Sequence, residues 1–547
     1  MCGIVGYIGE KNAVPIIIES LKFLEYRGYD SAGLVILAPG SKDFEVTRCR
    51  GKVADLEFIL ENDKNANLAL GHTRWATHGM PSEENAHPHR DCSGKIVVVH
   101  NGIVENYIML KELLLKEGHK FKSETDTEVI VHLIEHNYKG DIFEAVRRTV
   151  SMIEGSYALG VLHCEHPDVI IAAKKQSPLI IGVGENENFI ASDIPAILKY
   201  TKNVIYLEDD QLAIIKKHEV ILKDRKGKNL DKKIDEVTWD PEMAQKGGYD
   251  HFMLKEIFEQ PRAIRDTWQP RISEDEGKIF IKEMGLEDDE IRAINRIVIV
   301  SCGTSWHSGL IGRVFIERFT GIPVSVEYAS EFRYSKPILD KNVLTISISQ
   351  SGETADTLAA IRDAKKRGSK VISICNVFGS SIARESDGVI YTYAGPEIGV
   401  ASTKAFTSQI VVLYLFALCI GRIRRTLLIP ETLDKIEALR GLEEKILKVL
   451  ETSKQCKALA DILYSKKNFI YLGRGLGFAV AMEGALKLKE ISYIHAEGCH
   501  AGEMKHGPIA LIDKEMPVVF LALKGRRYSK IINNIEEVKA REGIVIA

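Results

Sequence analysis

Cys2 is a residue that could do chemistry, because removal of Met1 would leave a thiol and a free α-amino group on the same residue. An α-amino group titrates at a pH of roughly 8, so part of it is neutral in a cell and can accept the thiol proton without a histidine. Cys2 is therefore predicted to be a nucleophile that carries its own base. Position alone leaves open that it is an ordinary N-terminal cysteine.

Polar residues end several apolar runs in the next 125 residues, where a strand would fix the base of a functional loop. Asn101 and Gly102 can donate two hydrogen bonds to an oxyanion, or form a simple Asn-Gly turn. Arg74 and Asp126 can hold the carboxylate and ammonium groups of an amino acid, or be surface charges. These residues are the candidates for a site around Cys2.

Four histidines in the same region raise the question of zinc. Two of them stand beside Thr or Pro in loop-like sequence, and neither a cysteine nor a helical i,i+4 spacing supports ligation. We therefore expect no metal at His72, His78, His87 and His89.

Two loops rich in small hydroxyl residues lie between a strand-like run and a helix-like run, at 301–305 and 349–354. Such a loop suits a phosphate, because free backbone N–H groups and the helix dipole favour an anion. Neither loop has the spacing of a nucleotide-binding loop, which favours a phosphorylated small molecule over ATP or NAD. The alternative is simple helix capping by Ser351 and Thr354.

Acid and base residues gather near the C-terminal end. Lys487 and Glu490 share one helical face at i,i+3, and His506 follows in a Lys-His-Gly-Pro run. A solvated salt-bridge stripe through Glu483, Lys487 and Glu490 is the alternative.

The secondary-structure elements that must position these residues follow two different sequence patterns. Up to about residue 235, short β-rich runs alternate with helices expected at 15–24, 106–116 and 127–136, which indicates layered α+β structure. The mixed-charge segment 223–235 fits a linker. From about residue 296, strand, glycine-rich loop and helix repeat in a βαβ rhythm that implies parallel sheets and a duplicated fold.

Composition limits the function. The 547 residues are too many for one domain, and the net charge of −3 gives no reason to expect nucleic acid. The nine scattered cysteines favour a reducing compartment, and we expect the cytoplasm. The longest apolar run, 410–420, is shorter than the roughly 20 residues of a membrane span, so we predict a buried helix and no membrane partner.

The motifs of the first 235 residues resemble the glutaminase domain of N-terminal-nucleophile amidotransferases. They are Cys-Gly-Ile at 2–4, Tyr-Arg-Gly-Tyr-Asp-Ser-Ala-Gly at 26–33, His-Thr-Arg-Trp-Ala-Thr-His-Gly at 72–79, Asn-Gly at 101–102 and Glu-Thr-Asp-Thr-Glu at 124–128. The resemblance implies release of ammonia from glutamine, with Cys2 as nucleophile and base and Asn101 and Gly102 as the oxyanion hole. It implies a gate at Trp75 and glutamine-binding roles for Arg74, Thr77, His78 and Asp126.

The C-terminal half resembles the paired sugar-isomerase (SIS) domains of the glucosamine-6-phosphate synthase family, on residues 349–354, 401–406 and 483–497. With the glutaminase half in front, this implies transfer of the glutamine nitrogen to fructose 6-phosphate, giving glucosamine 6-phosphate and glutamate for hexosamine synthesis. The residues implied to hold the sugar phosphate are Ser305, Ser349, Gln350, Ser351 and Thr354, with Ser402 on the sugar.

The same resemblance assigns the later steps. His506 helps to open the sugar ring, Glu490 moves a proton between C1 and C2, and Lys487 supports the developing enolamine charge. Free ammonia is mostly protonated in water, so it must travel through a dry passage. The family histidine comes from the neighbouring subunit, which implies a homodimer, and no cofactor is needed.

The implied fold is an αββα N-terminal-nucleophile hydrolase sandwich followed by two doubly wound parallel α/β SIS domains, the second incomplete. The expected domains are 1–235 (glutaminase), 236–285 (linker and lead-in helices), 286–435 (first SIS domain) and 455–547 (second SIS domain).

One departure and one alternative remain. The resemblance stops at Ala547, before the family's last strand, helix and tail, and that tail carries a lysine that forms a Schiff base with the open sugar. We therefore expect glutamine hydrolysis to survive and sugar amination to be weak or absent. The alternative function is a sugar-phosphate-binding regulator with inactive catalytic residues, against which the intact Cys2, Asn101 and Glu490 argue.

Overall fold

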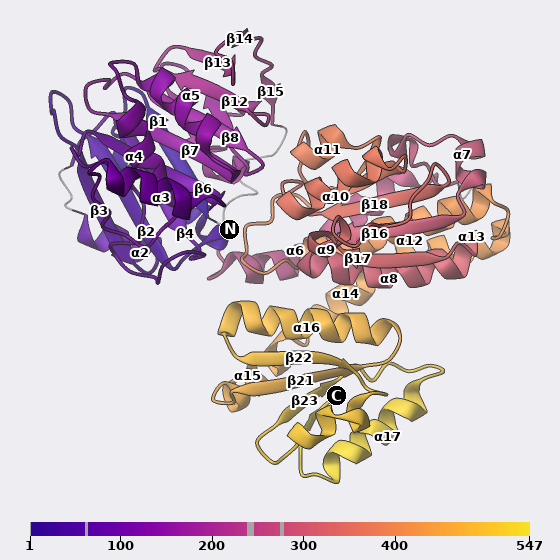
Figure 1. Cartoon of the computed structure of the whole chain (residues 1–547). Coiled ribbons are helices and arrows are strands. Elements are labelled where there is room, and N and C mark those ends of the chain that lie inside the picture. The colour runs from indigo at the N-terminus through magenta and orange to yellow at the C-terminus, as the bar shows by residue number, and fades with distance from the viewer. Residues whose placement is uncertain (1, 61–63, 238–245, 274–277) are drawn as a thin grey trace. The chain divides into compact units, whose positions relative to one another are not determined.

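Two stacked antiparallel sheets form the first of two units, Met1–Gln245 and Lys246–Ala547. The structure, a computed structural model, describes residues 2–60, 64–237, 246–273 and 278–547 (Figure 1). The first sheet has the order β15 (Asp235–Glu236), β11 (Asn203–Tyr206), β9 (Ile180–Val183), β10 (Asn188–Ala191), β1 (Gly3–Ile8), β4 (Leu68–Arg74), β2 (Ser31–Leu37) and β3 (Glu45–Arg50). The second has the order β14 (Asn229–Leu230), β13 (Val220–Asp224), β12 (Gln211–Ile215), β8 (Ile170–Lys175), β7 (Gly155–His163), β6 (Ile96–Val104) and β5 (His89–Arg90).

Alternation along β6 explains the layers of this unit. Val97 and Val99 face the core between the two sheets, whereas Ile96 and Val98 face the helices on the outer side. Those helices are α3 (Tyr107–Lys116), α4 (Thr127–Asn137) and α5 (Ile142–Met152), while α1 (Ala13–Lys22) and α2 (Val53–Ile59) accompany the first sheet. Gly71 of β4 lets α1 approach, because a Cβ there would overlap Ile17. The expected αββα sandwich is confirmed.

The predicted linker at 223–235 is wrong, because three strands begin, end or lie within it and tie it to both sheets. β13 ends at Asp224, and β14 and β15 pair at the outer edges of the two sheets. These edge strands are two residues long and face solvent on much of their surface, so they do not require alternating apolar residues. Their charged sequence therefore gives no strand pattern.

The second unit contains two parallel sheets. The first sheet has the order β17 (Val324–Tyr328), β16 (Arg296–Ser301), β18 (Val343–Ser349), β19 (Lys370–Cys375) and β20 (Gly388–Tyr391). Ile297 and Ile299 face one core and Val298 and Val300 another, so helices cover both faces. The first face packs mainly on α6 (Phe252–Trp268), α8 (Gly303–Thr320) and α12 (Lys404–Ile423), and the second on α9 (Ala329–Phe332), α10 (Ala355–Lys366) and α11 (Ser381–Glu385).

The second parallel sheet repeats this plan with four strands, in the order β22 (His495–His500), β21 (Asn468–Gly473), β23 (Pro517–Phe520) and β24 (Ile544–Ile546). Helices α16 (Leu476–Ser492) and α17 (Tyr528–Lys539) pack on its opposite faces (Figure 1). The duplicated, doubly wound fold is therefore confirmed. The remaining helices are α7 (Asp288–Ala293), α13 (Ile429–Arg440), α14 (Leu442–Leu450) and α15 (Ser453–Leu463).

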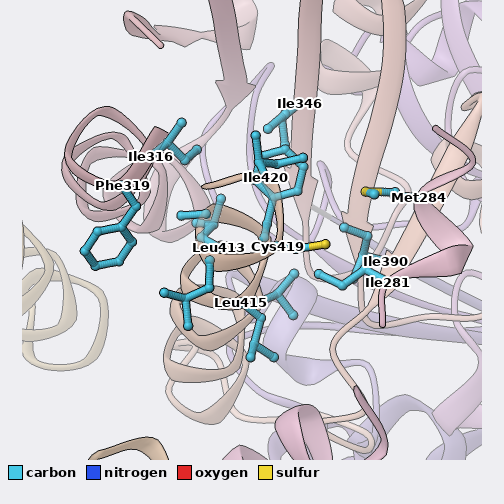
Figure 2. Close-up of a cluster of buried hydrophobic side chains, with 14 of the residues drawn as sticks. Ile281, Met284, Ile316, Phe319, Ile346, Ile390, Leu413, Leu415, Cys419 and Ile420 are labelled. Atoms are coloured by element: carbon cyan, nitrogen blue, oxygen red, sulfur yellow. The ribbon is translucent and has the colours of Figure 1, made fainter. Parts of the chain in front are cut away.

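Helix α12 contains the longest apolar run. Leu413, Leu415 and Ile420 pack with Ile316 of α8 and Ile346 of β18 in the main core (Figure 2). Among the described residues it is the one helix long and apolar enough to cross a membrane, but 72% of its apolar window is buried inside the protein. It is the buried helix that the sequence predicts.

Candidate functional site

Cys2 lies directly before β1, the strand between β4 and β10. Its Sγ accepts a hydrogen bond from the backbone N–H of Trp75 at 3.2 Å. Burial raises the pKa of the Cys2 thiol above its ordinary value, against the lowering effects of the Trp75 N–H and the Arg74 cation. The thiol is thus protonated near neutral pH and needs a base to react.

The Asn101 side chain is held with its amide NH2 group toward Cys2. Its Nδ2 donates to the carbonyl oxygen of Cys2 at 3.0 Å and to Ser192 Oγ at 2.9 Å. Its Oδ1 lies 3.0 Å from His72 Nε2, which is also 3.0 Å from the carbonyl oxygen of His100. Because both neighbours of His72 Nε2 are acceptors, this nitrogen carries the proton and fixes which way the amide faces.

His72 belongs to a buried histidine cluster that the sequence did not reveal. Burial lowers the pKa of His72 to about 3 and also lowers the pKa values of His87 and His100. Both His87 Nε2 and His100 Nδ1 bond the hydroxyl of Thr127, at 3.0 and 2.8 Å. These neutral rings hold the start of α4 against β6 through hydrogen bonds, and their partners lie too far along the chain for spacing to show.

Of the other two histidines weighed as zinc ligands, His89 belongs to the same buried cluster, with its ring centroid 4.8 Å from that of His87. His89 Nε2 lies 3.1 Å from Thr125 Oγ1, and the ring of His78 meets that of Tyr107 with centroids 5.4 Å apart. Each of the four histidines is thus engaged by a hydrogen bond or by a contact with another ring.

Arg74 and Asp126 are both buried charges beside Cys2. Arg74 donates to the carbonyl oxygens of His78, Gly79 and Met80, and Asp126 accepts the N–H of Val104 at 2.8 Å. Both charges act on the Cys2 thiol, Arg74 lowering its pKa and Asp126 raising it, so they flank the same point in space. The alternative of simple surface charges is wrong for both residues.

The remaining candidates of this unit sit at its surface. Trp75 is 42% exposed and meets the ring of Tyr29 edge-on, Thr77 is exposed, and His78 Nδ1 lies 3.3 Å from Thr77 Oγ1. Gly102 has φ +137°, and a Cβ there would overlap the Ser156 carbonyl, so only glycine fits beside Asn101.

The hydroxyl loop after β18 is folded on itself. Ser349 Oγ accepts the N–H of Gly352 at 3.0 Å and lies 3.1 Å from Thr354 Oγ1, and Ser351 Oγ accepts the N–H of Glu353. Thr354 is the N-cap residue of α10, and in the described chain no side-chain hydrogen bond caps this helix. Simple capping is therefore wrong for this loop, and the first N–H groups of α10 remain available to an anion.

The other predicted sugar-site residues surround the same parallel sheet. The backbone carbonyl of Gln350 accepts the N–H of Asn376 at 3.2 Å. Ser305, in the first turn of α8, accepts a bond from Gln409 Nε2 at 3.1 Å, and Ser402 donates to Glu397 at 2.8 Å. Glu397 also accepts the N–H of Thr403 at 2.8 Å, a role that sequence reasoning missed.

A charged group joins α16 to the start of α8. Lys487 Nζ lies 3.2 Å from Glu483, 2.7 Å from Glu490 and 2.9 Å from Thr304 Oγ1. Glu483 also accepts from His307 Nδ1 at 2.6 Å, and its side chain is only 8% exposed. The solvated-stripe alternative is therefore wrong, since Glu483 faces α8. Burial opposes ionisation of Glu483, but His307 and Lys487 hold its pKa below the ordinary value.

His506 is not brought to that group. It lies at the exposed end of a short 3-10 turn, Met504–His506, after β22. Within the described part of the chain its side chain makes no hydrogen bond or ion pair with Lys487 or Glu490.

Comparisons with known proteins agree with this geometry. A glutamine amidotransferase domain model matches residues 72–199, and an SIS domain model matches residues 290–419 and 462–547. The chain is similar to a C-terminal domain of glucosamine-fructose-6-phosphate aminotransferase from Francisella tularensis, with TM-score 0.54 and 42% identity over 55% of this chain and 84% of that one.

Full-length relatives extend the match. The chain is 52% identical to the glutamine–fructose-6-phosphate aminotransferase [isomerizing] of Caldanaerobacter subterraneus subsp. tengcongensis, over 100% of this chain and 90% of that protein. It is 52% identical to the protein of the same name from Clostridium tetani, over 99% and 89%. Because such identity runs through both units, the chain belongs to the isomerizing glutamine–fructose-6-phosphate aminotransferase family.

Proposed function

We propose that this enzyme transfers the amide nitrogen of glutamine to fructose 6-phosphate and isomerises the product to glucosamine 6-phosphate, with release of glutamate. The observation that carries this proposal is the Asn101 amide, held by His72 with its NH2 group directed at the backbone of Cys2. A thiol with a base at hand, a fixed donor for the oxyanion and two charges that can hold the substrate suit amide hydrolysis by a cysteine.

In the glutaminase half, the sulfur of Cys2 attacks the side-chain amide carbon of glutamine after its proton passes to the α-amino group exposed by removal of Met1. Asn101 and the Gly102 N–H stabilise the oxyanion, ammonia leaves, and water then releases glutamate. Arg74 binds the carboxylate of glutamine and Asp126 its ammonium group, with Thr77 and His78 beside them. Trp75, whose N–H contacts Cys2, gates the release of ammonia.

In the isomerase half, five residues hold the phosphate of the sugar: Ser305, Ser349, Gln350, Ser351 and Thr354. The uncapped start of α10 supports this role, because its N–H groups have no side-chain acceptor in the described chain. Ser402 contacts the sugar, Glu490 moves the proton between C1 and C2, and Lys487 stabilises the negative charge that forms between them. No cofactor takes part.

A homodimer would complete this second site. His506 opens the sugar ring of the neighbouring subunit, a role supported by its exposure and by its separation from the charged group of its own chain. Mixing His506→Ala with Glu490→Gln subunits should restore synthesis that neither variant shows alone. Failure of the mixture, in dimers verified by sedimentation, would assign His506 to its own subunit.

We also propose the domain extents 1–235, 236–285, 286–435 and 455–547, and a cytoplasmic location without nucleic-acid or membrane partners. Nine free cysteines suit a reducing compartment, and the charge is close to balanced.

The decisive experiment measures glutamate and glucosamine 6-phosphate separately, with and without fructose 6-phosphate. Wild-type protein should release glutamate, and its yield of glucosamine 6-phosphate tests the expectation that sugar amination by this chain is weak or absent. Cys2→Ala should lose both, and Glu490→Gln should keep glutamine hydrolysis while losing the amino sugar. A glutamine-analogue electrophile that leaves Cys2 unlabelled in peptide maps would contradict the proposed nucleophile.

A further inference from the structure

A second cluster of reactive side chains lies in the N-terminal unit, and the proposed function does not use it. Cys92 stands in the turn between β5 and β6, His119 follows α3, and His132 and Glu135 lie on α4. One ligand atom from each residue lies within 4.8 Å of every other. Three separate segments of the chain thus bring a thiol, two imidazoles and a carboxylate to one point.

The spacing of these atoms fits a tetrahedral metal. Cys92 Sγ lies 3.7 Å from His119 Nδ1 and 3.6 Å from His132 Nδ1, and Glu135 Oε2 lies 3.0 and 3.3 Å from the same two nitrogens. Zinc bonds of about 2.3 Å to sulfur and about 2.0 to 2.1 Å to nitrogen and oxygen, set at tetrahedral angles, separate sulfur from nitrogen by about 3.5 Å and nitrogen from oxygen by about 3.3 Å.

The surroundings of the cluster also suit a metal. The Nε2 of His132, on the far side of its ring, lies 3.6 Å from Glu128 Oε1, and Glu128 is itself fixed by the N–H groups of Lys122 and Ser123. A carboxylate behind a histidine is the usual outer partner of a zinc ligand, and Glu128 lies close to Nε2 although the two make no hydrogen bond in this structure. The N–H of Lys120 donates to Cys92 Sγ at 3.3 Å and so partly offsets the burial and the Glu135 carboxylate that raise the pKa of this thiol.

We propose that Cys92, His119, His132 and Glu135 bind one zinc ion. Four protein ligands leave no position open for substrate, so the ion is structural, and binding releases the thiol proton to water. A mixed sulfur and imidazole set favours zinc over magnesium or calcium. The ion would clamp α4 to the β5–β6 turn, and α4 begins directly after Asp126. The sequence suggested no metal because it drew attention to other histidines.

The neighbouring group Glu117, His119 and His136 provides a matched control. It shares His119, and its ligand atoms also lie within 4.8 Å of one another, but it offers no sulfur and both of its other members are exposed. His136 Nδ1 is paired with Glu117 at 2.8 Å. Substitutions there separate binding at the proposed site from binding by surface histidines.

The test uses the full chain, stripped with a chelator and then dialysed against zinc chloride. We expect one equivalent of zinc by mass spectrometry and a higher melting temperature than in the stripped protein. Cys92→Ser and His119→Gln should lose the equivalent, whereas His136→Gln and Cys456→Ser should keep it. Loss in Cys2→Ala instead would mean that zinc binds only the catalytic thiol, and would overturn the proposal.

Cobalt substitution tests the ligand set by spectroscopy, first in the wild-type protein and then in two cysteine variants. Stripped wild-type protein with one equivalent of Co²⁺ should show the intense visible bands of tetrahedral cobalt and a thiolate charge-transfer band in the near ultraviolet. Cys2→Ala should keep that band and Cys92→Ser should lose it. A wild-type spectrum typical of octahedral cobalt, or no binding of either metal, would refute the site.

Discussion

The orientation of the Asn101 side-chain amide decides whether it presents a hydrogen-bond donor or an acceptor to Cys2. Its carbonyl oxygen is engaged by His72, so its NH2 group is the part that faces the nucleophile. In the structure this NH2 group donates to the Cys2 carbonyl oxygen and to Ser192 Oγ. The proposed oxyanion role would use this fixed donor with little reorganisation, and such donors contribute strongly to rate.

Asn101→Ala should lower kcat for glutamine hydrolysis by about 10² to 10³-fold, the usual effect of removing one oxyanion donor. The KM for glutamine should change little, since Arg74 and Asp126 remain. Steady-state kinetics of glutamate release measure both parameters. An equal change in KM, with kcat intact, would show that Asn101 binds substrate instead.

His72→Leu removes the group that fixes the amide but leaves the amide itself. Because the amide can then face either way, we expect a fall in kcat of about tenfold, a smaller effect than loss of the donor. In the Asn101→Ala background the same substitution should add almost nothing, because a positioning residue acts only through its partner. Additive effects in this cycle would rule out that role, and His218→Gln, at an exposed histidine, is the control.

Sequence reasoning singled out Cys2 from its place directly behind Met1, and Arg74, Asn101 and Asp126 from their places at the ends of apolar runs. It could not find His72 as a positioning residue. That role depends on β4 and β6 coming together across the sandwich, and no local spacing reports this contact.

At the scale of elements, the strand-to-helix loop after β18 depends on glycine. Gly352 has φ +67°, and a Cβ there would overlap the hydroxyl of Ser380. The Gly352 N–H also binds Ser349 Oγ, so a shift of the backbone at this point would move the hydroxyl groups of the loop.

Gly352→Ala should therefore weaken binding of fructose 6-phosphate by about tenfold or more, as strain of about 1 to 3 kcal/mol is relieved by displacing the loop. Glutamine hydrolysis measured without the sugar should be unchanged. Gly368→Ala is the matched control: it lies just after α10 with φ +87° but has no neighbour within 4 Å of the added Cβ. Isothermal titration with the sugar phosphate measures the effect, and equal affinities for the two variants would contradict it.

The same elements show where sequence patterns succeed and fail. The parallel strands and α8 and α10 could be predicted closely, because each buried strand is a continuous apolar run and each helix is followed by glycine with positive φ, Gly321 or Gly368. The edge strands within 223–235 and the buried state of Glu483 could not. The pairing of these strands and the burial of Glu483 both depend on which elements pack against them. A charged local sequence carries no information about those neighbours.

For the whole molecule, the two units have separate cores. The buried histidine cluster lies entirely in the N-terminal unit, where burial lowers the pKa of His72 and of His89 to about 3 and that of His87 well below its ordinary value. In the unfolded chain each histidine would titrate at about 6.5. The unfolded state therefore binds more protons than the native state between pH about 6.5 and about 3.

The N-terminal unit should consequently lose stability as the pH falls from 6.5, by about 1.4 kcal/mol per pH unit for each histidine of the cluster, and the loss should be absent above pH about 7. Urea unfolding followed by hydrogen exchange of the β1 and β4 amides, corrected for the intrinsic rate at each pH, reports on this unit alone. His89→Gln should make the slope shallower, whereas His218→Gln, at an exposed histidine, should leave it unchanged. A midpoint that stays constant between pH 7 and pH 5 would mean that the cluster accepts protons in the folded state, and so that His72 is not the fixed neutral donor on which the orientation of Asn101 depends.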